Sequence, residues 1–403
     1  MMGEWKKYKL KDVCTILGDG LHGTPIYDDK GEFFFINGNN LKDGRISIKN
    51  DTKRVPYSEA NKYKKPLNNR TILVSINGTI GNVAKYRDEK CILGKSACFF
   101  NVKENVDLNF IYYVVANQQF KNTITQLATG TTIKNVSLET MRNYTFCIPP
   151  LSIQKQIGKI LSSFDDKIEL NRRINDNLEQ QAQALFKSWF VDFEPFKKGK
   201  FIDSELGMIP EGWQVEELGN ITNSITEKVG KRTDVKVLSP VNTGDLLLSE
   251  EYFTKQVYSK TLAKYIMVAP NDFAYNPTRI NIGSIGMNTF DFSGCVSPVY
   301  VVFRCEKEYH HFFNIFKATK NFKEEVNTRA IGGVRQTLSY KDFSLIKIVY
   351  PPKEAVEQFN KIYSHIMTLI KKNVLENKRL HQTRDTLLPK LMSGELKIND
   401  INN

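Results

Sequence analysis

Apolar residues recur with helical spacing in two long stretches, residues 151–193 and 353–396. In the first stretch they lie mostly three, four or seven positions apart, as one stripe of a long helix requires, at Ile157, Ile160, Phe164, Ile168, Ile174, Leu178 and Leu185. The second stretch repeats the pattern 202 positions later, at Phe359, Ile362, Ile366, Ile370, Leu380 and Leu387. Because the two stretches match in a single register, the pattern indicates an internal duplication.

A proline pair precedes each stretch, Pro149-Pro150 and Pro351-Pro352. Proline can start a helix but cannot lie inside one, so both boundaries are well marked. A helix of about 40 residues is roughly 60 Å long at 1.5 Å per residue, and so narrow an apolar stripe needs a partner. We expect the two helices to pack on each other as an antiparallel pair.

If the helices cross at their middles, Asn171 faces Asn373 at the centre of the seam. The same crossing opposes Phe164 with Leu380, Leu178 with Ile366, Ile157 with Leu387, and Leu185 with Phe359. A polar residue at such a seam can fix the register of the helices. The alternative interpretation is two asparagines that simply face solvent.

The stretches before the helices show the same order of elements. In residues 1–148 the pattern predicts strands at 32–36, 71–76 and 98–102 and a helix at 109–128; in residues 199–350 it predicts strands at 273–275 and 299–303 and a helix at 309–328. Matching residues are Trp5 with Trp213, Gly81 with Gly286, and Ile133 with Val334. The order along the chain is therefore globular, helical, globular, helical.

We expect an α+β fold with internal pseudo-twofold symmetry. Two similar mixed α/β domains, residues 1–148 and 199–350, are separated by two long antiparallel helices packed as a coiled coil, in residues 149–198 and 351–403. Two like domains joined by paired helices suit a protein that reads two short DNA sites, because the helices fix the separation and the linkage raises affinity.

The composition is that of a folded, basic protein. Hydrophobic residues make up 41% and charged residues 25%, and 57 Lys and Arg against 44 Asp and Glu give a net charge of +13. Such a surplus favours nucleic acid as a partner, although an ordinary basic protein can carry it as well. Six cysteines without a C-x-x-C pair, no apolar signal core and no run of eighteen apolar residues lead us to expect a cytoplasmic protein outside the membrane.

Several short motifs resemble enzyme sites but lack their context. Residues 18–23 fit G-x-G-x-x-G, yet turn residues follow where a dinucleotide site needs a helix. Gly94-Lys95-Ser96 lacks the first glycine of a phosphate loop. Tyr275-Asn276-Pro277-Thr278 is one residue short of the Asn-Pro-Pro-aromatic motif of amino-methylating enzymes, and no acidic-glycine cofactor loop accompanies it. No Pro-Asp dipeptide occurs, so the usual nuclease arrangement of a Pro-Asp ahead of an acidic-x-Lys lacks its first part. The five histidines have no metal-ligand spacing. We therefore expect no catalytic residues and no metal site.

Four segments resemble the specificity subunits of type I restriction-modification enzymes. These segments are IPPLSIQKQI at 148–157, ALFKSWFVDF at 184–193, LGMIPEGW at 206–213 and LLPKLMSGEL at 387–396. The first two are similar to that family's central conserved region, the third to the start of its second recognition domain, and the fourth to its C-terminal signature. The resemblance covers the whole chain in the right order.

The resemblance implies a function without catalysis. Each globular domain would be a target recognition domain that reads one half of a bipartite sequence in double-stranded DNA, and the helices would set the spacing and bind two methyltransferase subunits. This chain would bind no cofactor; S-adenosylmethionine, used to methylate adenine, and ATP are expected in the partner subunits. The sequence leaves open whether two restriction subunits also take part.

The residues that contact DNA are chosen on chemistry, because no family motif identifies them. Bases are read by Asn, Gln, Arg, Lys, Ser or Thr on exposed loops, and phosphates by Lys, Arg or loop amides. The base-reading candidates are Asn39, Asn40, Asn77, Thr79, Thr131, Thr132, Lys134 and Asn135 in the first domain and Asn242, Thr278, Arg279, Asn281, Arg335 and Gln336 in the second. The phosphate candidates are Lys62, Lys64, Lys65, Arg70, Lys228, Lys231 and Arg232. The alternative is ordinary turn chemistry on a solvated basic face.

Two other functions stay open at this point. The chain could be a stand-alone DNA-binding scaffold whose helices bind no enzyme. It could also be an autonomous methyltransferase or nuclease, which the missing motifs disfavour.

Overall fold

The computed structural model describes residues 5–49, 51–253, 255–330 and 337–396. The chain folds as two compact units, Met1–Arg172 with Val374–Asn403 and Arg173–Asn373. Each unit contains one globular part, called here the first head (residues 5–148) and the second head (residues 201–350), together with a stretch of both long helices. The boundaries between the units fall inside the helices, whereas the sequence suggests four consecutive segments.

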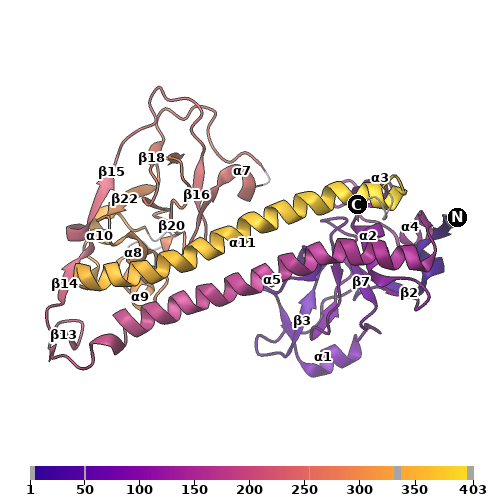
Figure 1. Cartoon of the computed structure of the whole chain (residues 1–403), viewed down its shortest axis with the longest axis horizontal. Coiled ribbons are helices and arrows are strands. Elements are labelled where there is room, and N and C mark those ends of the chain that lie inside the picture. Colours follow the sequence, from indigo (N-terminus) through magenta and orange to yellow (C-terminus); the bar gives the residue numbers. More distant parts are fainter. Residues whose placement is uncertain (1–4, 50, 254, 331–336, 397–403) are drawn as a thin grey trace. The chain divides into compact units, whose positions relative to one another are not determined.

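The two long helices form where the apolar pattern predicts them. Helix α5 spans Leu151–Phe190 and α11 spans Lys353–Ser393, so both begin directly after their proline pairs (Figure 1). The carbonyl of Pro150 accepts from the amide of Gln154 at 3.0 Å, as at the first turn of a helix. Within the described residues, no helix has both the length and the apolar composition needed to cross a membrane.

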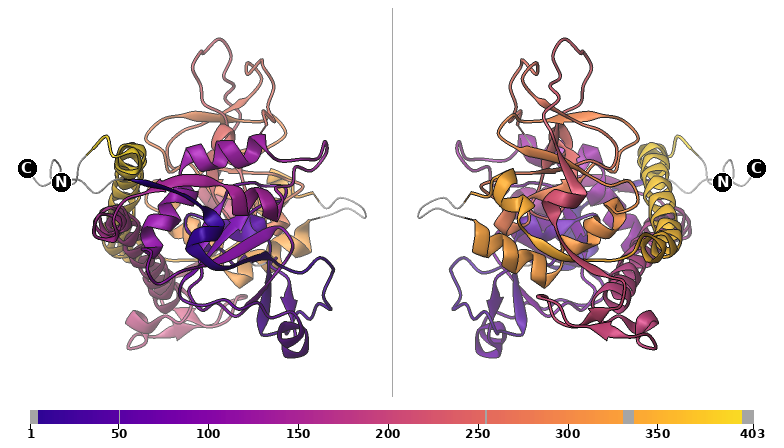
Figure 2. Two further views of the ribbon diagram at one scale, coloured as in Figure 1. Left: turned by 90° about the vertical axis from the view of Figure 1, so that its right-hand side faces the viewer. Right: turned by 90° about the vertical axis from the view of Figure 1, so that its left-hand side faces the viewer.

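The helices pair antiparallel within each unit, and Figure 2 shows them side by side. In the first unit Asn171 Nδ2 donates to Asn377 Oδ1 at 2.9 Å and to Glu376 Oε2 at 2.8 Å. In the second unit Asn373 Nδ2 donates to Asn175 Oδ1 at 2.8 Å. The predicted facing of Asn171 with Asn373 is therefore corrected. Each asparagine bonds a residue four positions beyond the predicted one, about one helical turn.

The expected seam residues are buried to different depths. Ile157, Asn171, Phe359 and Ile366 are buried, whereas Phe164, Leu178, Leu185, Asn373, Leu380 and Leu387 are half-buried. The best-covered apolar positions of α5 include Leu161 at 0% exposure and Phe186 at 3%. Both residues lie in the apolar clusters that the helices form with the heads, next to the predicted stripe positions Ile160 and Leu185.

The first head is built on an antiparallel sheet in the order β2-β10-β7-β8. Its strands are β1 Lys6–Lys9, β2 Cys14–Asp19, β3 Phe33–Ile36, β4 Leu41–Lys42, β5 Arg45–Ile46, β6 Arg54–Val55, β7 Thr71–Ser75, β8 Val83–Lys85, β9 Cys91–Leu93, β10 Ala97–Val102 and β11 Thr145–Ile148. Its helices are η1 Leu10–Val13, η2 Gly38–Asn40, α1 Tyr57–Lys62, α2 Leu108–Ala116, α3 Gln118–Gln126 and α4 Leu138–Asn143.

The second head repeats this topology, with a sheet in the order β15-β22-β19-β20. Its strands are β12 Phe201–Ile202, β13 Ile209–Pro210, β14 Gln214–Glu217, β15 Thr222–Ile225, β16 Leu238–Pro240, β17 Leu246–Leu248, β18 Ile266–Val268, β19 Phe273–Tyr275, β20 Ile285–Met287, β21 Gly294–Val296, β22 Val301–Cys305 and β23 Lys347–Tyr350. Its helices are α6 Leu218–Ile221, α7 Ser249–Tyr252, η4 Ile280–Ile282, α8 His310–Phe316, α9 Lys320–Arg329 and α10 Tyr340–Ser344, with η3 Glu194–Phe196 before it.

Two details of the predicted duplication need correction. The single helix expected in each head is broken in two, because Asn117 and Thr319 adopt extended backbone and cap the next helix. The predicted match of Gly81 with Gly286 is also displaced. Gly286 pairs with Ala274 inside β20, whereas Gly283, with φ +92°, lies just before that strand as Gly81, with φ +83°, lies before β8.

Candidate nucleic-acid interface

Two polar loops of the first head, far apart in sequence, lie against each other. The β7–β8 loop and the α3–α4 loop are joined by a hydrogen bond from Gly78 N to Lys134 O at 3.1 Å. The side-chain amide of Asn77 donates to Asn135 Oδ1 at 3.2 Å. The structure thus brings two groups of predicted DNA-binding residues into one surface.

The side chains on these loops face solvent. Asn77 is half-buried, and the exposed members are Thr79, Thr131, Thr132, Lys134 and Asn135. Gly130 holds the α3–α4 loop in this shape with φ +98°, and a Cβ at this position would lie 2.4 Å from the carbonyl oxygen of Ile133. Only glycine fits such a turn without a shift of the backbone, so the loop presents its polar side chains outward.

A third loop, η2, packs beside the same end of the sheet. Gly38 N donates to Ser96 Oγ at 2.8 Å, and Ser96 O accepts from Ile76 N at 2.9 Å. Asn39 and Lys95, which neighbour these anchors along the chain, are exposed. Three loops therefore contribute to one polar face of the first head.

Two predicted contacts are corrected because their side chains are used inside the fold. Asn40 is only 6% exposed, and its Nδ2 donates to Ser47 O at 3.1 Å. The guanidinium of Arg70 donates to three main-chain carbonyls between residues 102 and 106, at 2.7 to 2.8 Å. The Asn40 amide and the Nε and Nη2 atoms of Arg70 are thus engaged within the first head.

The other phosphate candidates of this head lie on or after α1. Lys62 is exposed, with Nζ 4.9 Å from the ring centroid of Tyr63. Lys64 is exposed and Lys65 is half-buried. No hydrogen bond of the described residues joins these lysines to the three-loop face.

Sequence reasoning missed Lys95 and His22 as candidates. Lys95 N donates to Leu21 O at 2.9 Å, so Lys95 and His22, the residue after Leu21, lie on adjoining turns. His22 Nε2 lies 2.6 Å from Asp19 Oδ2. Among the described residues neither Lys95 nor Lys134 forms an ion pair. The signal in the sequence is a lysine in a tight turn, Gly94-Lys95-Ser96, a motif that also resembles part of a phosphate loop.

One backbone anchor of the first head has a counterpart among the described residues of the second head. Leu338 N donates to Pro277 O at 3.0 Å, as Val136 N donates to Ile76 O at 2.8 Å in the first head. Next to this anchor, Thr278 and Arg279 are exposed. The segment after β19 is therefore joined to Leu338 ahead of α10, as Ile76 is joined to Val136 in the first head.

The other candidates of the second head are more scattered. Asn242 is exposed and Asn281 half-buried, whereas Arg335 and Gln336 lie outside the described residues. Lys228, Lys231 and Arg232 are exposed together on the loop before β16.

Arg232 is already engaged, since its Nη2 donates to Glu227 Oε1 at 2.5 Å and its Nη1 to Lys228 O at 2.9 Å. Its guanidinium is thus less available to a phosphate than the two neighbouring lysines.

The described side chains offer donors and positive charge to a ligand. Burial raises the pKa of the thiols of Cys14 and Cys91 to about 12, which disfavours the reactive thiolate. Across the described ranges no three or more His, Cys, Asp or Glu side chains gather in a way that could hold a metal ion. The exposed chemistry is that of polyanion recognition.

Comparison with known proteins agrees with this chemistry. Residues 2–180 match the family described as the type I restriction modification DNA specificity domain. The specificity subunit of type I restriction enzyme MjaIX from Methanocaldococcus jannaschii is 27% identical over 360 residues, 82% of this chain and 78% of that protein. The specificity subunit of type I restriction enzyme HindI from Haemophilus influenzae is 23% identical over 476 residues, 98% of this chain and 100% of that protein.

A solved structure shares the fold. The crystal structure of the type I restriction-modification system S subunit from M. genitalium superposes with a TM-score of 0.55 at 18% identity, and covers 96% of each chain. Its likeness agrees with the two-headed topology described above. Residues 2–180 thus match the type I restriction modification DNA specificity domain, and along most of its length the chain is similar to type I specificity subunits.

Proposed function

We propose that this chain selects the DNA sequence on which a type I restriction-modification enzyme acts, and that it performs no catalysis itself. The observation that carries the proposal is the loop pair at the end of the sheet in the first head, where Asn77 and Asn135 meet beside exposed Lys134. Asparagine amides can pair with adenine in the major groove, and lysine can bind phosphate. The net charge of +13 supports a polyanionic partner.

We infer that the target is bipartite. Both heads have the same strand order and the same loop anchor, so each can bind one short stretch of double-stranded DNA in a similar way. Linking two such heads raises affinity without any new contact, because the second binding event becomes intramolecular. A single short site would use only one head.

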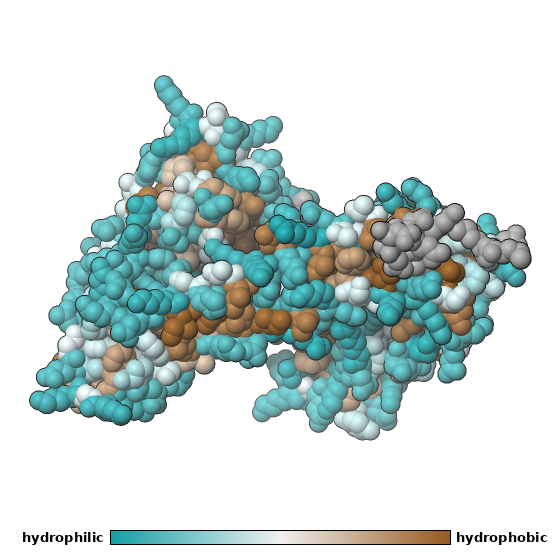
Figure 3. Space-filling model, in the orientation of Figure 1, coloured by the Kyte–Doolittle hydropathy of each residue, from teal (hydrophilic) through white to brown (hydrophobic). Residues whose placement is uncertain are grey.

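The long helices supply surfaces for protein partners. In the first unit Leu170 on α5 and Val374 and Leu375 on α11 are 51%, 58% and 52% exposed; Figure 3 shows hydrophobic side chains along these helices. Exposed apolar side chains that gather on one surface usually mark an interaction site.

In the second unit Ile174, Ile362 and Leu369 are 39%, 44% and 37% exposed. We propose that one methyltransferase subunit docks on each unit, and that restriction subunits join where the system also cleaves DNA. S-adenosylmethionine and ATP would be bound by those partners.

Methylation mapping tests the proposal. The chain would be co-expressed with its modification subunit, and methylated adenines mapped in the host DNA. We expect one bipartite motif that depends on this chain, with one half altered by Asn135→Ala and unaltered by Asn105→Ala, a control at an exposed asparagine elsewhere in the first head. A stable complex with DNA but with no methyltransferase on pull-down would instead favour a scaffold.

A further inference from the structure

In the first unit, α5 turns one charged face toward the first head. Asp165, Glu169 and Arg172 are four and three residues apart, so they lie on the same side of the helix. Each contacts a side chain outside α5. A role for this face in DNA recognition rests on the proposed function, because the face holds the head whose loops would read DNA.

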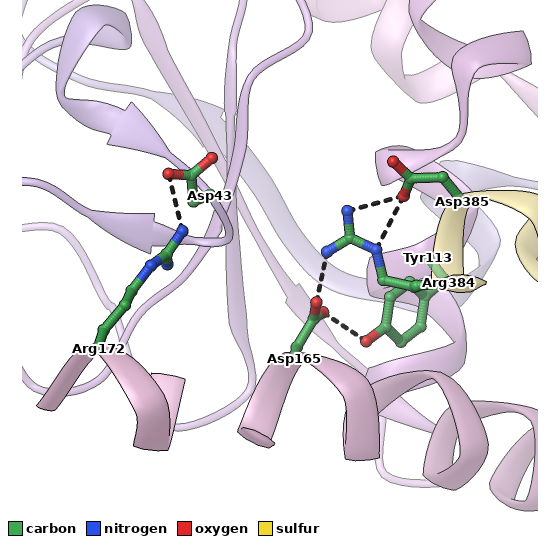
Figure 4. A network of polar contacts seen from close by, with 6 residues as sticks. All are labelled: Asp43, Tyr113, Asp165, Arg172, Arg384 and Asp385. Carbon is green, nitrogen blue, oxygen red and sulfur yellow. Dashed lines mark hydrogen bonds and ion pairs between the residues drawn. The ribbon is translucent and has the colours of Figure 1, made fainter. Parts of the chain in front are cut away.

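Asp165 is the centre of this face. Its Oδ2 accepts from the hydroxyl of Tyr113 at 2.6 Å, and its Oδ1 accepts from the guanidinium of Arg384 (Figure 4). Tyr113 is 1% exposed, and the side chains of Asp165 and Arg384 are 24% and 20% exposed. Three elements, α2 of the head and both long helices, thus meet at one carboxylate.

The β4–β5 turn adds two contacts on the following turns of α5. Asp43 Oδ2 accepts from Arg172 Nη2 at 3.1 Å, also drawn in Figure 4. Arg45 Nη1 lies 3.4 Å from Glu169 Oε2. The head is therefore attached to α5 by polar contacts at Asp165, Glu169 and Arg172.

The second unit has apolar residues in place of Tyr113, Asp165 and Arg384. With the 202-residue repeat of the helices, the counterparts are Ile315 for Tyr113, Met367 for Asp165 and Ala182 for Arg384. Ala182 is buried in the apolar cluster of the second unit, and Ile315 and Met367 pack against that cluster. The contact of Asp165 with Tyr113 and Arg384 in the first unit is thus replaced by apolar residues in the second.

We propose that Asp165 and Arg384 are positioning residues that hold the first head in one orientation on its segments of α5 and α11. A head held in this way presents its loops to DNA in one direction, so the complex accepts its two half-sites at one spacing. The two residues need no contact with DNA for this role, since they act through the placement of the head.

Asp165 and Asp385 both pair with Arg384, and the two ion pairs should differ in how much they contribute to holding the head. Removal of the guanidinium leaves the half-buried Asp165 with Tyr113 as its hydrogen-bond partner, and breaking such a pair from one side is costly. Asp385, the other carboxylate on Arg384, is 62% exposed and 2.7 Å from Nη2. Loss of an exposed partner has little effect, so Asp385→Ala is a matched control.

The experiment uses the assembled methyltransferase with its mapped DNA target. Binding is measured to duplexes with the native spacer and with one base pair added, for wild type, Arg384→Ala, Asp385→Ala and the triple variant Tyr113→Ile, Asp165→Met, Arg384→Ala. We expect Arg384→Ala to bind the native duplex roughly tenfold more weakly, because effective concentration falls, and to discriminate less between spacers. Asp385→Ala should behave as wild type.

The triple variant separates orientation from charge. It carries the apolar residues of the second unit, so we expect it to fold and to recover spacer discrimination even if Arg384→Ala is poorly folded. Base preference within each half-site should be unchanged in every variant. Unaltered spacer discrimination in a folded Arg384→Ala complex, or no recovery in the triple variant, overturns the positioning role alone. Absence of sequence-specific methylation by the wild type overturns the proposed function and, with it, this role.

Discussion

Asn171 donates a hydrogen bond to Asn377 at 2.9 Å, and the duplicate pair does the same in the other unit, where Asn373 donates to Asn175 at 2.8 Å. Asn171 and Asn373 are 202 positions apart, as are Asn175 and Asn377. Donor therefore matches donor and acceptor matches acceptor across the duplication. The asparagines lie at the helix seam, although their register differs by one turn from the predicted crossing.

Replacing Asn171 with alanine should lower stability. The side chain is fully buried and supplies both hydrogen bonds to α11, so we expect a loss of about 1 kcal/mol in the free energy of unfolding. Chemical denaturation of the complete chain measures it. Asn177→Ala, at an exposed asparagine of the same helix, should stay within about 0.5 kcal/mol of wild type. Equal losses in both variants would mean that the seam bonds contribute little.

The apolar pattern predicts the helices, their boundaries and their antiparallel pairing, but not the register. A displacement of four residues is close to one turn of 3.6 residues, so it turns nearly the same face toward the partner. Apolar positions alone therefore do not distinguish the two alignments. The hydrogen bonds of Asn171 and Asn373 do, because they require a donor and an acceptor to lie opposite each other.

The split helices show a similar limit. Apolar spacing continues through Asn117 and Thr319, which predicts one helix in each head. Both residues are good N-caps, and each accepts a backbone amide two or three residues later. Capping chemistry at these positions is readable from the sequence, and it outweighs the apolar periodicity.

The sequence offers candidate residues by type, but it does not show which of their side chains are accessible. Asn39 and Asn40 are neighbours of identical chemistry, yet one is exposed and the other bonds Ser47 inside the head. Arg70 is likewise satisfied by carbonyls more than 30 residues away. Such outcomes depend on which distant segments pack nearby, which local pattern does not encode.

Lys134→Ala should weaken DNA binding with little regard to sequence. An exposed lysine without an ion pair among the described residues is suited to a phosphate contact. Its loss should reduce the slope of log K against log salt by about 0.9. Titrations of cognate and unrelated duplexes at several salt concentrations measure this slope. Lys90→Ala, at a lysine 3.5 Å from Glu32, is the control; a change confined to the cognate duplex would contradict a phosphate role.

His311 should make the second unit sensitive to acid. Burial lowers the pKa of His311 from 6.5 to about 3, and its Nδ1 has no hydrogen-bond partner. A base whose pKa is lower in the folded state binds more protons when unfolded, so stability falls as pH drops from about 6.5 towards 3. We expect His311→Phe to lose less thermal stability than wild type between pH 6.5 and 4.5.

A histidine on the same unit provides the comparison. His365 is exposed, so His365→Phe should keep the acid dependence of the wild type. If the melting temperatures of the wild type and His311→Phe fell equally as the pH dropped, His311 would not be the cause of the loss of stability in acid.

Leu375→Asp should block partner docking without unfolding the chain. The side chain is 52% exposed on α11, so a carboxylate there stays hydrated in the free chain but would be buried under a docked subunit. We expect wild-type melting and at least a tenfold loss of methyltransferase binding, about 1.4 kcal/mol. Calorimetric titration of the purified subunits measures the binding, and a melting curve measures the stability. Lys378→Asp, at an exposed polar position on the same helix, controls for added charge.

The most direct measurement is an adenine methylation map of cells that express the modification subunit with and without this chain. We expect one bipartite motif, methylated only when the chain is present. An identical map in its absence would contradict the account.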